Sequence, residues 1–360
     1  MLFYFYQIFA FYSSQYGVEY INMQEALLWQ KEESKKVKCL NCSHYCLINE
    51  GDFGICNVKQ NVKGKLYSLN HGLICAIGID PIEKKPLFHF LPGTNTFSFA
   101  APGCNFACAN CQNWQISQGP KILKKVNGEN IPSKELVARA RGSNCPSISY
   151  TYTEPTIFSE YAIETMEIAK KEGLKNIWVS NGYFSKELLK EIIPLLDAVN
   201  IDLKSFDENF YQKNCSAKLW PIIDNLRNLK KNGIWIEITT LLIPGFNDKK
   251  EELKNIARFI REDLGAETPW HITRFFGQSS WKMKNVPDTE LEKLAMARKI
   301  GIEEGLRYVY LGNVPGIDFE DTYCPHCKEK VIDRNGYDIT RYDISGKCPN
   351  CLYKIDGLIQ

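Results

Sequence analysis

Short apolar runs rich in β-branched and aromatic residues alternate with helical stretches between residues 97 and 313. The expected strands are FSFAA (97–101), SISYTY (147–152), NIWVSN (176–181), VNIDLK (199–204), WIEITTLLI (235–243), WHITRF (270–275) and YVYLGN (308–313). The expected helices cover 133–141, 157–172, 185–193, 219–232, 249–263 and 288–304. This repetition predicts an α/β fold with a parallel sheet and right-handed crossovers. Because such sheets carry their chemistry at the carboxyl ends of the strands, the residues after each run are candidates for a functional site.

The cysteines indicate metal binding. The chain has 360 residues and 14 cysteines, and 11 of these cysteines fall into three tight groups. A chain of this length does not depend on disulfides for its core, and close C-x-x-C spacing is typical of metal ligation in a reducing compartment. We therefore expect a cytoplasmic metalloprotein. The remaining Cys75, Cys145 and Cys215 are expected to pack as small hydrophobic residues.

The charge distribution argues against a nucleic-acid surface. The net charge is +2 at neutral pH, and no long run of Lys or Arg occurs. A surface that follows a phosphate backbone needs clustered basic residues. We therefore expect no nucleic-acid partner.

The first twelve residues, MLFYFYQIFAFY, form an apolar run shorter than the ~20 residues of a membrane-spanning helix. The first basic residue is Lys31, so the run also lacks the basic start of a secretory signal. We interpret residues 1–22 as an extension of the true start at Met23, with an interfacial aromatic anchor as the alternative, and we expect no membrane association. From Met23 to Val37 we expect a charged helical stretch.

Three cysteines follow the first expected strand in the loop APGCNFACANCQNW, with the spacing Cys104-x3-Cys108-x2-Cys111. Three thiolates can bind three irons of a 4Fe–4S cluster, which normally takes four cysteines, and so leave one iron open. An open coordination position is typical of a catalytic metal. S-adenosylmethionine (SAM) can chelate such an iron and be cleaved to a 5′-deoxyadenosyl radical. A zinc knuckle, or a conventional cluster with a distant fourth ligand, is the alternative.

This loop resembles the signature of the radical SAM superfamily. Further segments in chain order are similar to the radical enzyme of the AmmeMemoRadiSam system, a relative of pyruvate formate-lyase activating enzymes. These segments are DPIEKKPLFHFLPG, TYTEPTIFSEY, VSNGYFS, NIDLKSF, TTLLIPGFND, TPWHITRFF, YVYLGNVPG and DTYCPHC. The resemblance runs from Met23 to the C-terminus. It implies a partial (β/α)6 TIM-like barrel, and an enzyme that uses SAM to abstract hydrogen from a small molecule or a protein backbone.

The resemblance also implies partners. An external electron donor of flavodoxin or ferredoxin type is expected, together with Memo-like and AMMECR1-like companions that serve as substrate or as processor of the product. A different class of function stays open, namely a non-catalytic zinc-ribbon scaffold that binds protein or nucleic acid. Such a scaffold would be colourless and would not cleave SAM.

The resemblance assigns SAM contacts to successive strand ends. Glu154 lies in the turn YTEP (152–155), where activating enzymes carry Gly-Gly-Glu-Pro, and would accept a charge-assisted bond from the methionine ammonium. The alternative is an ordinary Glu-Pro helix start. Asn181, which Gly182 follows, would contact the ribose, with a plain strand-end turn as the alternative.

Three further positions are expected to face the cofactor. Asp202 and Lys204 are two residues apart, so their side chains point to one face of a strand. We interpret them as ribose and carboxylate contacts, with a buried Asp–Lys pair as the alternative. His271 would approach SAM, or act as a structural hydrogen-bonding residue. Asn110 stands where the superfamily typically has an aromatic residue, so either Asn110 hydrogen-bonds the adenine or Trp114 packs beside it.

Two further cysteine groups flank the barrel. The first is Cys39-x2-Cys42-x3-Cys46-x9-Cys56, and its four thiolates predict a structural metal, with an auxiliary iron–sulfur cluster as the alternative. The second pairs Cys324-x2-Cys327 with Cys348-x2-Cys351, which is typical of a zinc ribbon or a rubredoxin-like module. Zinc is favoured there over a single iron. His44 and His326 lie within these groups and are not expected to be ligands.

The sequence thus predicts a central barrel between two small metal modules. The expected segments are 1–22 (start extension), 23–65 (N-terminal four-cysteine module), 66–96 (connector), 97–315 (barrel) and 316–360 (C-terminal module).

Overall fold

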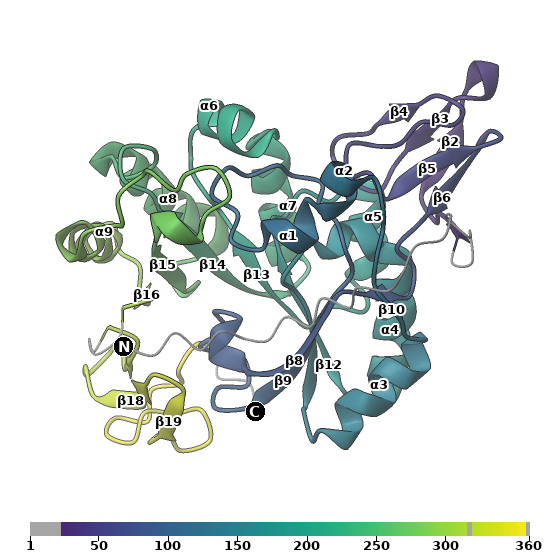
Figure 1. Ribbon diagram of the computed structural model, residues 1–360. Helices are drawn as coiled ribbons and strands as arrows, with labels where there is room; N and C mark the ends of the chain where they lie inside the picture. Colours follow the sequence, from purple (N-terminus) through teal and green to yellow (C-terminus); the bar gives the residue numbers. More distant parts are fainter. Residues whose placement is uncertain (1–22, 315–318, 358–360) are drawn as a thin grey trace.

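The computed structural model describes residues 23–314 and 319–357, so the expected start extension at 1–22 lies outside the described residues. Its main feature is an eight-stranded sheet in the order β16-β15-β14-β13-β12-β11-β9-β8 (Figure 1). The strands are β8 Ala76–Pro81, β9 Asn95–Ala100, β11 Ser147–Tyr150, β12 Lys175–Ser180, β13 Ala198–Asp202, β14 Trp235–Leu242, β15 Trp270–Arg274 and β16 Val309–Gly312. The seven strands expected from the sequence are confirmed.

Neighbouring strands from β9 to β16 are parallel, whereas β8 pairs antiparallel with β9. The sheet is edged by β8 and β16, which gives the partial barrel that the resemblance implies. Its parallel strands are mostly buried on both faces, as the all-buried pattern of Ser147–Tyr150 illustrates, whereas the edge strand β8 has one exposed face. This burial explains why they appear in the sequence as short, nearly continuous apolar runs.

Helices connect the parallel strands. They are α1 Trp114–Ser117, α2 Gly119–Leu123, α3 Ser133–Gly142, α4 Ser159–Lys171, α5 Lys186–Ile192, α6 Glu208–Phe210, α7 Trp220–Lys231, α8 Lys250–Phe259 and α9 Leu291–Glu303. Two of them, α4 and α5, show why these segments form helices. Along α4, Tyr161, Thr165 and Ala169 recur every fourth residue and are buried, so one face of the helix packs on the sheet. A serine hydroxyl caps α5, because Ser185 Oγ accepts a hydrogen bond from Leu188 N at 3.0 Å.

The N-terminal module consists of small antiparallel sheets. Its strands are β1 Gln24–Glu25, β2 Trp29–Lys31, β3 Val37–Cys39, β4 Leu47–Ile48, β5 Lys59–Val62 and β6 Lys65–Ser68. The helical stretch expected from Met23 to Val37 is wrong, because β1 pairs with β6 and β2 pairs with β3. Buried Ala26 and Val37 pack with Ile48 and Leu66 from later in the chain. This tertiary packing overrides the local helical preference of the charged residues.

Two short strands, β7 Leu73–Ile74 and β10 Glu129–Asn130, pair antiparallel beside the main sheet. The segment expected as a connector, 66–96, also contributes β8 to the main sheet itself.

The C-terminal module contains β17 Thr322–Tyr323, β18 Lys330–Asn335 and β19 Asp338–Arg341 in one antiparallel sheet. It lies near the β16 edge, whereas the N-terminal module lies on the opposite side of the main sheet (Figure 1). Arg334 fixes it in place, because its guanidinium donates to the Phe88 carbonyl at 2.7 Å and lies 4.3 Å from the centre of the Phe88 ring. No helix within 23–314 or 319–357 combines the length and the apolar character that crossing a bilayer requires.

Candidate active site

A cavity of about 800 Å³ lies at the carboxyl ends of the main-sheet strands. Its wall includes most of the site residues expected from the sequence, namely Cys104, Cys108, Cys111, Glu154, Asn181, Asp202 and Lys204. These residues come from the loop after β9 and from the ends of β11, β12 and β13. The parallel topology therefore brings together side chains that are a hundred residues apart in sequence.

The cluster loop, residues 101–113, is mostly buried, and hydrogen bonds from a neighbouring turn hold its backbone. Ala107 N donates to Cys215 O at 3.0 Å and Ala109 N to Asn214 O at 2.9 Å, so the π-helical turn Tyr211–Cys215 holds its backbone. Burial raises the pKa of the Cys104 thiol well above its usual value, and the nearby Glu154 carboxylate raises it further. A buried thiol of this kind ionises when a cation binds it.

The remaining two thiols have different partners. A hydrogen bond with Cys215 and burial raise the pKa of Cys108, while Cys111 Sγ lies 3.3 Å from Ser117 Oγ. Cys215, expected to pack as a small hydrophobic residue, is fully buried and also contacts a thiol of the cluster loop.

Glu154 and Asn181 are connected directly. The Glu154 carboxylate accepts hydrogen bonds from Asn181 N at 2.8 Å, Ser180 Oγ at 2.7 Å and Thr156 Oγ1 at 2.6 Å. Asn181 Nδ2 in turn donates to Asn105 Oδ1 at 2.8 Å, next to Cys104. Burial raises the pKa of Glu154, and the hydrogen bond from Asn181 acts in the opposite direction. The wall is thus one network that joins the cluster loop to two strand ends.

Gly182, directly after Asn181, has a positive φ of 72°. A Cβ atom at this position would lie 3.0 Å from Ile201 Cγ2. Both the backbone conformation and the packing therefore favour glycine.

Asp202 and Lys204 form an ion pair on the cavity wall, with Lys204 Nζ 2.7 Å from Asp202 Oδ2. Burial alone would lower the pKa of Lys204, but Asp202, Cys108 and Cys215 outweigh it and raise the pKa well above its usual value. Lys204 thus stays charged beside the cysteine loop. The pair that the sequence left as an alternative exists, and it faces the cavity.

His271 does not line the cavity. Its Nε2 lies 2.6 Å from Glu237 Oε2 on the neighbouring strand, and its ring stacks on Tyr310 at 5.3 Å. The side chain is 3 % exposed, near the amino end of β15. The structure thus gives His271 the partners of a structural hydrogen-bonding residue, away from the expected SAM contacts.

The residues present fit a bound adenosine. Asn110 lines the cavity, and within the described residues nothing hydrogen-bonds its buried Oδ1 atom. Trp114 is not part of the cavity wall and stacks on Trp281 with ring centres 6.4 Å apart. The hydrogen-bonding interpretation of Asn110 is therefore the one that the geometry supports.

Sequence reasoning missed several residues of this network. Asn105 accepts from Asn181, and Ser180 and Thr156 donate to Glu154. Each is adjacent to, or two residues from, a residue that the sequence did identify. This proximity in sequence could have identified them, since a small polar residue beside a site residue often orients that residue.

The N-terminal thiol cluster, Cys39, Cys42, Cys46 and Cys56, lies in one compact module. Burial raises the pKa of Cys42 well above its usual value, and repulsion from Cys39, Cys56 and Cys46 raises it further. Among the described residues, the thiols that all lie within 4.8 Å of one another are those of the C-terminal module and not these four. The Asn41 backbone lowers the pKa of Cys39 and the His44 backbone lowers the pKa of Cys42, each against the larger effect of burial.

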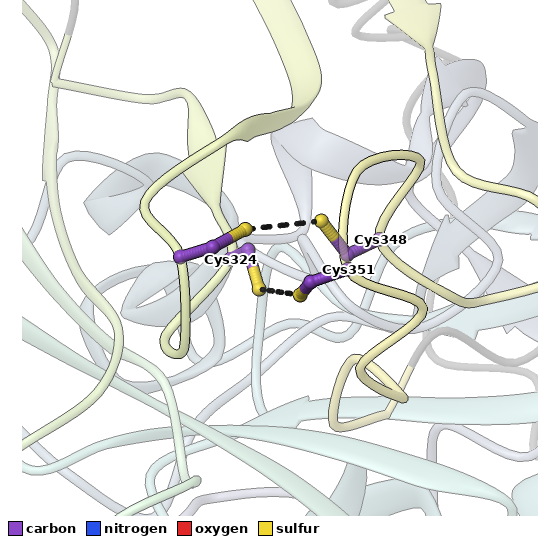
Figure 2. Close-up of side chains that lie close together, drawn as sticks. Cys324, Cys348 and Cys351 are labelled. Atoms are coloured by element: carbon purple, nitrogen blue, oxygen red, sulfur yellow. Dashed lines mark hydrogen bonds between the residues drawn. The ribbon is translucent and has the colours of Figure 1, made fainter.

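The C-terminal thiol cluster, Cys324, Cys327, Cys348 and Cys351, is drawn tightly together. The thiols of two loops point toward one another (Figure 2). Cys324 Sγ lies 3.6 Å from Cys351 Sγ, Cys327 Sγ lies 3.5 Å from Cys348 Sγ, and all four atoms are within 4.8 Å of one another. A tetrahedral zinc with ~2.3 Å Zn–S bonds separates its sulfurs by about 3.8 Å, so the geometry fits a single metal ion.

Comparison with known proteins agrees with this geometry. The model of the radical SAM superfamily matches residues 99–260. An uncharacterized protein of Methanocaldococcus jannaschii is 45% identical over 337 residues, which cover 93% of this chain and 99% of that protein. A putative glycyl-radical enzyme activating enzyme of the same organism is 29% identical over 64% of this chain and 82% of its own length.

A more distant relative is the pyruvate formate-lyase-activating enzyme of Clostridium pasteurianum, 23% identical over 50% of this chain and 76% of that enzyme. Membership of this family implies a 4Fe–4S cluster and SAM, and the three cavity thiols together with the buried carboxylate fit both groups. The chain therefore belongs to the radical SAM superfamily and is an enzyme of that class.

Proposed function

We propose that this enzyme reductively cleaves SAM at a 4Fe–4S cluster held by Cys104, Cys108 and Cys111, and that it abstracts hydrogen from a substrate. The observation that carries the proposal is that these thiols share one cavity with a buried carboxylate, Glu154, and an ammonium, Lys204. When reduced, the cluster supplies the electron that breaks the C–S bond of SAM and yields a 5′-deoxyadenosyl radical.

The residues of the chain bind and orient SAM. Glu154, held by its hydrogen bonds in one orientation, is suited to the methionine ammonium. Lys204 is suited to the carboxylate and Asp202 to the ribose hydroxyls, while Asn110 Oδ1 would accept from the adenine amino group. Asn181 is proposed to contact the ribose. His271 is proposed to have a structural role through its hydrogen bond with Glu237.

The substrate is proposed to be a protein backbone, by analogy with the relatives named as activating enzymes. The electron would come from a flavodoxin or ferredoxin. Memo-like and AMMECR1-like companions are proposed from the sequence resemblance. We propose a reducing, cytoplasmic compartment, because all 14 cysteines are free thiols and only reduced thiols can bind metals or iron–sulfur clusters.

Each terminal module is proposed to hold a structural metal. For the C-terminal thiol cluster we propose zinc, supported by its sulfur–sulfur separations. For the N-terminal thiol cluster we propose a structural metal because four cysteines occur within 18 residues, with an auxiliary iron–sulfur cluster as the alternative.

The test is anaerobic reconstitution with iron and sulfide, reduction, and addition of SAM. The wild-type protein should release 5′-deoxyadenosine and Cys104→Ala should not. Cys145→Ala is the matched control, since Cys145 is buried outside all three groups. If the wild type and Cys104→Ala give equal yields, the proposal is wrong and a non-catalytic metal scaffold is favoured.

A further inference from the structure

The N-terminal module does not sit apart from the active site. Its loop between Cys39 and Cys46 packs against the three segments that build the SAM-facing wall, namely the cluster loop, the turn after β11 and the turn after β12. The backbones of Cys42 and Phe184 pair in an isolated antiparallel β-bridge, and Ser43 N donates to Tyr183 O at 3.0 Å. Ser43 Oγ also donates to Phe184 O at 2.9 Å. These contacts hold the chain just beyond Asn181.

Asn41 reaches the turn that carries Glu154. Its side-chain amide donates to Thr156 O, and its Oδ1 accepts from Ser159 Oγ at 2.6 Å. Thr156 itself donates to Glu154. Asn41 is 3 % exposed, so both bonds are sheltered from water and their loss would leave buried polar atoms unpaired.

His44 reaches the cluster loop. Its Nε2 lies 3.0 Å from Asn105 O, and because a carbonyl only accepts, the ring donates through Nε2–H. Its ring centre is 4.8 Å from that of Tyr183, two residues after Asn181. The side chain of Asn105 accepts from Asn181, so His44 supports the residue that links Cys104 to the ribose side of the wall.

Both residues lie beside cysteines of the N-terminal thiol cluster in the chain. Asn41 directly precedes Cys42, and its side chain donates to the Thr156 carbonyl in the Glu154 turn. His44 lies between Cys42 and Cys46, and its side chain donates to the Asn105 carbonyl in the cluster loop. The positions of Cys42 and Cys46 therefore set the backbone from which these two side chains reach the SAM-facing wall.

We propose that a thiolate-bound metal in the N-terminal thiol cluster fixes Asn41 and His44, and that these two positioning residues set the affinity of the active site for SAM. Metal binding and SAM binding are then thermodynamically coupled, so each raises the affinity for the other. The inference rests on the proposed function, because it needs a SAM site at Glu154 and Asn181. It adds a site outside the cavity that controls binding within it.

The experiment measures the SAM dissociation constant by equilibrium dialysis under anaerobic, unreduced conditions, together with zinc, iron and sulfide per chain. His44→Ala should weaken SAM binding about fivefold to tenfold, the worth of one buried hydrogen bond. His44→Gln, whose amide can donate to Asn105 O, should restore most of the affinity. The visible absorbance of the catalytic cluster should be equal in both variants.

A second part of the experiment removes the metal and measures the effect on SAM binding. Cys56→Ser should lose either one zinc or one complement of iron and sulfide, and should bind SAM as weakly as His44→Ala or more so. Cys351→Ser is the matched control, since it removes a thiol from the C-terminal thiol cluster, none of whose cysteines lines the cavity. It should lose metal and keep its SAM affinity.

The outcomes separate the two claims. Wild-type affinity in both His44→Ala and Cys56→Ser overturns the coupling, and an unchanged metal content in Cys56→Ser overturns the metal site. Should Cys56→Ser fail to fold, the comparison of His44→Ala with His44→Gln still tests the positioning role of His44, and wild-type affinity in His44→Ala then overturns the proposal. A wild-type protein with a complete cluster that binds no SAM overturns the proposed function itself.

Discussion

The Glu154 carboxylate accepts a hydrogen bond from the backbone N–H of Asn181 at 2.8 Å, across two neighbouring strand ends. This bond means that the carboxylate is placed by the fold and not by SAM. A site that is held in its binding geometry beforehand loses less entropy when the cofactor binds.

Glu154→Ala is expected to affect stability and binding together. It leaves the donors of Asn181, Ser180 and Thr156 buried without an acceptor, so unfolding free energy should fall by about 2–3 kcal/mol. Urea denaturation measures this loss, and equilibrium dialysis should show weakened SAM binding. Exposed Glu191→Ala is the control and should change neither quantity; an equal effect in both variants would contradict the role given to Glu154.

Asp202→Asn should weaken SAM binding about tenfold, since it replaces a charged acceptor with a neutral one. The cluster content should stay unchanged, because Asp202 is not a metal ligand. Asp197→Asn offers a matched control, because Asp197 also pairs with a lysine, Lys175, but lies at the amino end of the strand. Equal SAM affinities for the two variants would remove Asp202 from the site.

Protein stability should depend on His89 below neutral pH. Burial lowers the pKa of His89 to about 4, whereas an unfolded histidine titrates near ~6.5. The folded state therefore binds fewer protons in this window, and the unfolding free energy should decrease as pH falls through it. At the lower end of this pH window, the decrease in unfolding free energy caused by His89 reaches about 3 kcal/mol.

His89→Asn provides the comparison for this pH dependence. Nδ1 of His89 donates to Asp356 O at 2.7 Å, and an asparagine amide can replace that bond. Urea denaturation of both proteins at a series of pH values measures the difference in unfolding free energy. A difference that stays constant between neutral pH and about pH 4 would show that His89 does not titrate as argued.

Removal of the C-terminal metal should release the end of the chain. Cys351→Ser is expected to lose one metal ion per chain and to expose residues 322–355 to limited proteolysis by trypsin. Structural metal binding is part of the folding free energy of so small a module. SAM cleavage should persist until the module is cut. A protease-resistant Cys351→Ser protein would mean that packing alone holds the module.

The parallel strands of the main sheet were predictable because they are mostly buried on both faces and so stand out as apolar runs. Glu154 and Asn181 follow such runs, and the sequence resemblance assigned them to the expected site. Asn41 and His44 were not, because their partners are 115 and 61 residues away and nothing local marks the contact. The bond between His271 and Glu237 required the strand register, which an apolar pattern does not give.

For the stretch from Met23 to Val37, a local pattern gave a wrong prediction, because a helix was expected and the structure has strands. Its charged residues favour a helix locally, yet β1 pairs with β6, more than forty residues later in sequence. A pairing partner at that distance outweighs an intrinsic preference of a few tenths of a kcal/mol per residue.

The bond between Arg334 and the Phe88 carbonyl joins residues 246 positions apart. During synthesis the Phe88 segment emerges from the ribosome long before Arg334 does. His271 and Tyr310 of the barrel can already pack on the Phe88 ring, but the face that Arg334 covers in the folded chain stays open until then. Nascent chains with uncovered apolar surface are prone to misassembly. A ribosome that stalls before residue 334 therefore releases a chain in which this face of the Phe88 ring has no guanidinium to cover it.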